Sequence, residues 1–165
     1  MPENDEVDRI VDAWQAVRPD LDFAPLQVLS RVKRLALHLE RARRTSFAHA
    51  GIDSWEFDVL SALRRAGDPS ELSPKALLAQ NRVSSGTMTN RIDRLEQRGL
   101  VERRSDPGDG RGVLVALTAE GRTRVDEAIS RLLDAENDLL GDLSPTDLDE
   151  LGALLRRLSI AFDII

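Results

Sequence analysis

The sequence contains no cysteine, and this absence excludes several kinds of chemistry at once. Disulfide bonds, thiolate catalysis, cysteine-ligated zinc and cysteine-based redox sensing all require a thiol that this chain does not have. Lysine is also scarce, with Lys33 and Lys75 as the only two in the sequence. Aromatic residues make up 4% of the chain. A core built from these residues must consist mainly of leucine, valine, isoleucine and alanine.

Long apolar runs are missing as well. No run approaches the length of a transmembrane helix, and the opening MPENDEVD has neither the basic start nor the apolar stretch of a secretory signal. We therefore expect a cytoplasmic protein that does not enter a membrane. The 165 residues, of which 41% are hydrophobic and 32% charged, suit one globular domain.

The formal net charge is -6, but the charges are unevenly distributed. Acids are in excess at both ends of the chain, whereas nine arginines face six acids between residues 82 and 124. The arginines are Arg82, Arg91, Arg94, Arg98, Arg103, Arg104, Arg111, Arg122 and Arg124. A basic segment of this kind in an acidic chain can meet phosphate.

Apolar periodicity, caps and glycine stops predict a mainly α-helical chain with one β-hairpin. The expected helices cover residues 5–18, 25–50, 54–67, 74–80, 86–99, 119–140 and 145–164, and the expected strands cover 100–104 and 113–117. Expected helix caps are Asp53 or Ser54, Ser73, Ser84 or Ser85, Thr118 and Ser144. In the second helix we expect an inward apolar stripe of Leu26, Leu29, Val32, Leu35, Leu39 and Ala42.

A short helix, a tight connection and a capped second helix form a helix-turn-helix, and a hairpin directly after it makes the motif winged. The second helix offers short donors and acceptors and one arginine, groups that read base edges in a major groove. These candidates are Ser84, Ser85, Thr87, Thr89, Asn90 and Arg94. The free N–H groups at the start of that helix also favour phosphate.

The hairpin tip, SDPGDGRG, carries one arginine among glycines. Gly108, Gly110 and Gly112 permit a tight turn, and the small tip lets Arg111 reach into an adjacent minor groove. We expect the carboxylates of Asp106 and Asp109 to brace this loop rather than to touch DNA.

The sequence contains no residue pattern that is typical of an enzyme active site. The two histidines, His38 and His49, have no metal-ligand spacing, no histidine is placed to activate a serine, and there is no phosphate-binding loop. We therefore expect a protein that is not an enzyme and that holds no metal or cofactor.

The run SSGTMTNRIDRLEQRGLVERRSDPGDGRGVLVALTAEG resembles the core of the MarR family of winged-helix regulators, and the wing spacing of Asp106, Asp109 and Arg111 matches. The chain departs from the common family wing at Gly110, where that wing has a basic residue. The resemblance implies a homodimer on a pseudo-palindromic DNA site, with interlocked terminal helices. It also implies dimerisation and pocket-wall helices over residues 1–50, a DNA-binding lobe over 51–121 and dimerisation helices over 122–165.

The last helix supports a dimer independently, because it is more apolar than one terminal helix needs. Its apolar residues are Leu148, Leu151, Leu154, Leu155, Leu158, Ala161, Phe162, Ile164 and Ile165.

Trp14, Asp58, Arg91 and Arg103 match the urate-responsive branch of the family, which includes PecS-like regulators. In that branch the matching residues form or support a pocket for an anionic ligand, and Arg103 is positioned to couple the pocket to DNA. The segment from Trp14 to Arg43 also resembles an actinobacterial group that responds to trans-aconitate. The resemblance therefore implies urate or a tricarboxylate as ligand.

Each of these residues also has a structural interpretation. Trp14 completes an apolar stripe and suits plain core packing, and Asp58 could form a buried salt bridge, with Arg91 as one partner. Arg103 could be a phosphate contact. We favour a dimeric repressor that an anion releases from DNA; the alternative is a ligand-binding or interaction module whose winged helix no longer binds DNA.

Overall fold

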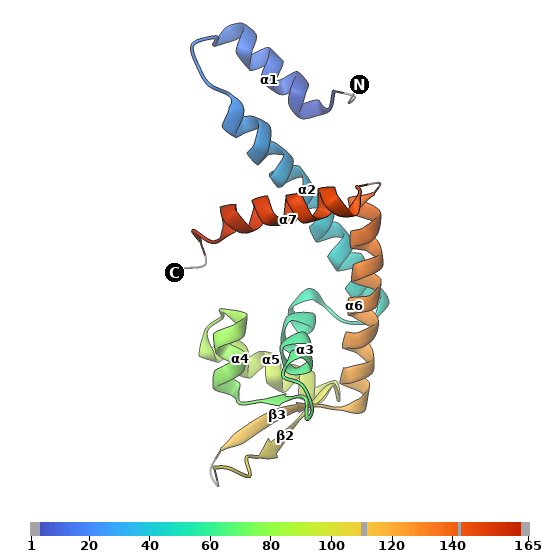
Figure 1. The fold of residues 1–165 in the computed structure, drawn as a ribbon. Coiled ribbons are helices and arrows are strands. Elements are labelled where there is room, and N and C mark those ends of the chain that lie inside the picture. Colours follow the sequence, from blue (N-terminus) through green and yellow to red (C-terminus); the bar gives the residue numbers. More distant parts are fainter. Residues whose placement is uncertain (1–3, 110–111, 142, 163–165) are drawn as a thin grey trace.

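The structure, a computed structural model, describes residues 4–109, 112–141 and 143–162 and is mainly helical. The helices are α1 (Glu6–Val17), α2 (Ala24–His49), α3 (Ser54–Arg65), α4 (Pro74–Asn81), α5 (Ser85–Gln97), α6 (Ala119–Leu140) and α7 (Pro145–Ser159). The strands are β1 (Glu71–Leu72), β2 (Val101–Ser105) and β3 (Val113–Leu117). Figure 1 shows a lobe of α3, α4, α5 and the sheet at one end, α1 at the other end, and α2 and α6 between them.

The predicted winged helix-turn-helix is present in this lobe. Ser73 begins α4 and Ser84 begins α5, because each hydroxyl accepts a backbone N–H in the first turn, at 3.2 Å in both cases. Between the two helices Arg82 has a left-handed backbone with φ of 51°, which makes the turn tight. The wing strands β2 and β3 then pair antiparallel, with Val101 opposite Leu117.

The sheet has a third strand that the sequence did not indicate. Residues 71–72 lie outside the two expected strands, but Glu71 pairs with Ala116 and Leu72 with Val115, so the order is β1-β3-β2. Two residues are too short to show an alternating pattern, and only their pairing with β3 defines them as a strand.

The core lies where α2, α3, α4, α5, α6 and the sheet meet. Its largest fully buried apolar side chains include Phe47, Leu60, Leu63, Leu77, Met88, Ile92 and Leu95. The rings of Phe47 and Phe57 stack with centroids 4.2 Å apart and join α2 to α3. At the start of α6, a Cβ on Gly121 would lie 1.9 Å from the Leu100 carbonyl oxygen, so only glycine allows α6 to approach the wing this closely.

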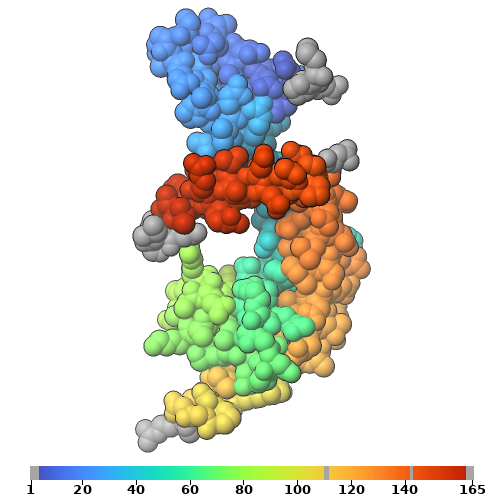
Figure 2. Space-filling view, in the orientation of Figure 1, coloured from blue at the N-terminus to red at the C-terminus, as the bar shows by residue number. Residues whose placement is uncertain are grey.

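The predicted inward stripe of α2 is wrong for the single chain. Four of its six residues are exposed, namely Leu29, Val32, Leu35 and Leu39. The last helix has no buried residue along its length and ends at Ser159, earlier than expected. Figure 2 shows α7 standing away from the lobe across an open space. A single chain therefore leaves large apolar faces of α2 and α7 without a cover.

Helix α1 is attached to α2 by apolar packing and by ion pairs. Val7 and Val11 are buried, and Arg31 of α2 bonds to Asp5 at 2.8 Å and to Asp8 at 2.7 Å. No helix in the described part of the chain is both long and apolar enough to span a membrane.

Candidate DNA-binding face and anion-binding hollows

Helix α5 presents its polar residues to solvent and its apolar residues to the core. Met88, Ile92 and Leu95 are buried against the lobe. The six predicted groove-reading residues of this region are all exposed: Ser84, Ser85, Thr87, Thr89, Asn90 and Arg94. The arrangement leaves one face of the helix free to enter a major groove.

Sequence reasoning missed Trp55, which lies at the start of α3 beside this face. The Arg94 guanidinium carbon lies 4.8 Å from the centre of the Trp55 ring, and that of Arg91 lies 5.7 Å from it. Both distances allow cation–π attraction. The tryptophan hollow, of about 500 Å³, is lined by Trp55, Gly86, Thr87, Asn90, Arg91 and Arg94. Nothing in the sequence signals this contact, because α3 and α5 are far apart along the chain.

Arg103 links the wing to helix α5. Its guanidinium forms ion pairs with Asp93 and Glu96 of α5, and its backbone N–H donates to Glu96 at 3.1 Å. The hydrogen bond to Asp93 is the main reason that the pKa of Arg103 lies above its usual value. In this arrangement the Arg103 side chain holds α5 and β2 together.

Hydrogen bonds close the base of the wing tip. The Asp106 carboxylate accepts the Gly108 N–H at 2.8 Å, and the backbone N–H of Asp106 donates to the Gly112 carbonyl at 2.9 Å. The Gly112 N–H donates to the Asp109 carbonyl at 2.7 Å. Arg111, the residue of the expected minor-groove contact, and its neighbour Gly110 lie outside the described residues.

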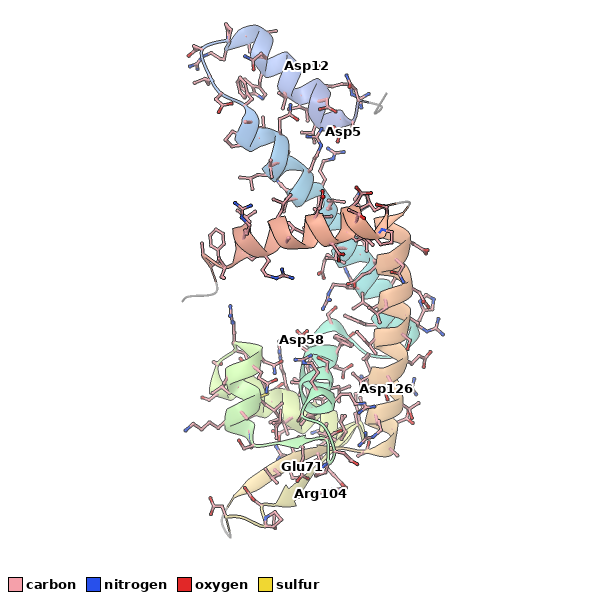
Figure 3. All side chains as sticks on the ribbon, viewed as in Figure 1. Asp5, Asp12, Asp58, Glu71, Arg104 and Asp126 are labelled. Carbon is pink, nitrogen blue, oxygen red and sulfur yellow. The ribbon has the colours of Figure 1, made fainter. Side chains whose placement is uncertain are left out.

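The four residues of the expected anion pocket do not meet within one chain. Trp14 is half exposed on α1 and stacks on Phe23 at 6.3 Å, and Figure 1 shows α1 at the opposite end from α3 and α5. Arg91 lines the tryptophan hollow, and Arg103 is paired with α5. Asp58 lies on the side of α3 that faces α7, as Figure 3 shows.

The interpretation of Asp58 as half of a buried salt bridge is wrong. Asp58 is exposed, and its carboxylate has no ion pair among the described residues. The reason is that Asp58 lies on the outer side of α3, whereas its neighbours Phe57 and Val59 face the core.

Asp58 instead lines a second hollow, which we call the three-arginine hollow. Its volume is about 370 Å³, and α2, α3 and the end of α4 form its walls. The lining residues are Arg43, Phe57, Asp58, Ser61, Arg65, Gln80, Asn81 and Arg82. This concentration of guanidinium groups was not expected from the sequence, since the arginines come from three separate elements.

Among the described residues no group of three or more His, Cys, Asp or Glu side chains could hold a metal ion.

An exposed polar helix beside a two-stranded wing defines a winged helix-turn-helix DNA-binding protein. A sequence profile described as the MarR family matches residues 50–112. The chain is 36% identical over 152 residues to the HTH-type transcriptional regulator PecS of Dickeya dadantii, covering 92% of each protein. The chain belongs to the MarR family of transcriptional regulators, is similar to its PecS-like branch and is not an enzyme.

Solved structures agree with this assignment. A cysteine-to-serine mutant of MarR from Escherichia coli in complex with operator DNA is 26% identical, with a TM-score of 0.65 over 88% of this chain and 96% of MarR. BpsR of Bordetella bronchiseptica, whose DNA binding is regulated by 6-hydroxynicotinic acid, is 27% identical, with a TM-score of 0.63 over 80% of this chain and 92% of BpsR.

Proposed function

We propose that this protein is a homodimeric repressor that binds a pseudo-palindromic operator and is released by a small anion. The observation that carries the proposal is the exposed polar face of α5 beside the wing. The protein would act in the cytoplasm, where it has access to DNA.

For operator binding, α5 would enter the major groove. Ser84, Ser85, Thr87, Thr89, Asn90 and Arg94 would contact bases or phosphates there. Arg111 would reach the minor groove from the wing tip, and Arg103 would support the wing or meet a phosphate. The MarR complex with operator DNA supports this mode of binding.

For dimerisation, the uncovered faces of α2 and α7 would pack against those of a second copy. Leu154, Leu155 and Leu158 of α7 are exposed in the single chain. Exposed apolar area of this extent is typical of an interface between subunits.

For release, we propose urate or a tricarboxylate such as trans-aconitate, with Trp14, Asp58, Arg91 and Arg103 as candidate ligand-binding residues. Because α1 lies far from α3, Trp14 would have to come from the partner copy. Arginine binds carboxylates and the urate edge through paired N–H groups, Asp58 would accept a urate N–H, and Trp14 would supply a flat wall. The regulation of BpsR by 6-hydroxynicotinic acid supports a small organic acid.

The proposal is tested by fluorescence anisotropy with a labelled duplex from upstream of the protein's own gene, at two salt concentrations. We expect tight binding that weakens as salt rises, because contacts with phosphate release counterions. We expect Asn90→Ala to reduce the preference for this duplex over a scrambled one, with Gln80→Ala as the control. If the wild-type protein does not bind the duplex in preference to the scrambled one, and selection from random duplexes also recovers no bound sequence, the proposal is contradicted.

A further inference from the structure

We propose that Glu56 and Arg98 are positioning residues that fix α5 relative to α2 and α6 and thereby determine the half-site spacing that the operator must have. The inference rests on the proposed function, because it concerns a homodimer that binds two half-sites with two copies of α5. It adds a determinant of operator selectivity that lies outside the proposed DNA-binding face.

Glu56 is a buried carboxylate at the start of α3. Its side chain is 1% exposed, and it accepts the backbone N–H of Asp53 at 2.8 Å, which completes the cap of the helix. Its ion-pair partner is the guanidinium of Arg98, the residue that ends α5. A buried carboxylate is costly unless a cation and hydrogen-bond donors compensate it, so Glu56 holds Arg98 at this position.

The guanidinium of Arg98 also binds the turn that follows α2. Its second nitrogen, Nη2, donates to the carbonyl of Gly51 at 2.7 Å. Nη1 of Arg124, on α6, donates to the adjacent carbonyl of Ala50 at 3.1 Å. Carbonyls at the end of a helix have no partner within the helix, and these two arginines supply the donors. We call Glu56, Arg98, Arg124 and the two carbonyls the arginine clamp.

Position 51 of the arginine clamp requires glycine. The φ of Gly51 is 70°, in the left-handed region, and a Cβ there would lie 2.8 Å from Nη1 of Arg124. A side chain at this position would therefore push α6 away from the turn that follows α2.

The arginine clamp joins elements that otherwise pack against different neighbours. Helix α2 packs mainly against α6, and also against α1 and α3, whereas α5 packs against α4 and β2. Figure 1 shows α2 and α6 beside each other, with α5 in the lobe. In the proposed dimer α2 belongs to the interface and α5 to the operator face, so the clamp connects the geometry of the interface to the helix that enters the groove.

The distance between the two copies of α5 selects the operator, because half-sites recur after one turn of DNA, about 34 Å. One base pair more or less moves a half-site by about 3.4 Å and rotates it by about 35° around the DNA axis. A dimer that holds both copies of α5 firmly rejects such a change. A dimer in which α5 can shift tolerates it, since the shift occurs in both copies.

The test is fluorescence anisotropy of the full-length protein with three labelled duplexes. One is the operator duplex, and the other two have one base pair added or removed at its centre. We expect the wild type to bind the natural spacing about tenfold or more tightly than either altered spacing. This preference should fall to about threefold or less in Glu56→Gln and in Arg98→Gln, because a buried pair that lacks one charge no longer holds α5.

Glu56→Gln separates the arginine clamp from the helix cap, since glutamine still accepts the Asp53 N–H but carries no charge for Arg98. A purely structural loss would weaken binding to all three duplexes alike and leave their ratio unchanged, and thermal melting checks folding. Arg131→Gln is the matched control, because it breaks an ion pair with Glu127 within α6 alone and should keep the wild-type ratio.

A second measurement needs no DNA. Because the chain has no cysteine, Gln97→Cys, at an exposed position of α5, provides a single attachment point for a spin label in each copy. Double electron–electron resonance then gives the distance between the two labels of a dimer. We expect a narrow distance distribution for this protein and a broader one when Glu56→Gln is added.

The inference is overturned if the folded variants keep the wild-type ratio, if the wild type binds all three duplexes equally, or if Glu56→Gln leaves the distance distribution unchanged. The first two results leave operator binding intact. A wild type that binds no duplex, including any recovered by selection from random sequences, contradicts the proposed function instead, and the distance distribution then decides the inference.

Discussion

At the scale of single residues, Trp55 connects α3 to the exposed face of α5 through two arginines. Its ring lies between two helices and is approached by Arg91 and Arg94, both from α5. A cation–π contact near the surface contributes about 0.5–1 kcal/mol, too little to decide folding but enough to favour one orientation of an arginine. Trp55 therefore favours one orientation of Arg91 and of Arg94, and Arg94 is one of the proposed DNA-binding residues.

We predict that Trp55→Ala weakens operator binding by about three- to tenfold, as expected from the loss of two cation–π contacts. Trp55→Phe should lose less, because it keeps an aromatic face. Anisotropy titrations of both variants give the comparison. Equal operator affinity in wild type and Trp55→Ala, with both proteins folded, would contradict a role for the ring.

The roles of several single residues could be predicted from the sequence, because each role depends on hydrogen bonds to residues close by in the chain. Ser73, Ser84, Thr118 and Ser144 were predicted as helix caps, and each accepts the expected N–H. Such bonds span three residues, so the sequence determines them. Trp55 and the exposure of Asp58 depend on how helices distant in sequence pack, which no local pattern reports.

At the scale of elements, the main feature is the connection between the wing and α5. Arg103 of β2 is paired with Asp93 and Glu96 of α5, and all three side chains are at least a third exposed. Exposed pairs of this kind add at most about 1 kcal/mol to stability. Their effect is geometric, since they keep β2 and α5 in one orientation, and the single charge of Arg103 offsets one of the two carboxylate charges on α5.

We predict that Arg103→Gln lowers operator affinity by about tenfold or more while the melting temperature changes little. The reason is that unpaired Asp93 and Glu96 would repel phosphate. The combined variant Arg103→Gln, Asp93→Asn, Glu96→Gln should recover part of the affinity because it removes the repulsion. If the combined variant binds no better than Arg103→Gln, charge is not the cause.

Apolar periodicity and cap residues predicted most of the helices and both wing strands. The features that the sequence did not predict depend on contacts between distant parts of the chain. Strand β1 exists only through its pairing with β3. Helix α2 showed the expected apolar stripe, yet Leu35 is 57% exposed in the single chain. The pattern identifies an apolar face of the helix but does not say whether the rest of the same chain buries it.

At the scale of the whole molecule, exposed apolar side chains lie along both α2 and α7 in the single chain. Burying a fully exposed leucine contributes about 2 kcal/mol, so many such contacts on both copies are needed to offset the cost of association. The proposed dimer would place two copies of α5 on successive turns of DNA.

We predict that the pair Leu154→Asp and Leu158→Asp converts the dimer to monomer and lowers operator affinity, since a monomer engages one half-site. Sedimentation equilibrium measures the mass of each protein. Asp149→Asn, a polar change on the same helix, should remain dimeric. A wild-type protein that is monomeric at micromolar concentration would contradict this part of the account.

The central claim is that an anion bound in the lobe releases the protein from DNA. The most direct measurement is the anisotropy of a preformed complex with a labelled operator duplex during titration with trans-aconitate. We expect wild-type protein to dissociate and Trp14→Ala protein to remain bound at the same anion concentration, because Trp14 is a proposed ligand-binding residue on α1, at the opposite end from α5. If both complexes remain intact at saturating anion, or if both dissociate equally, the claim is contradicted.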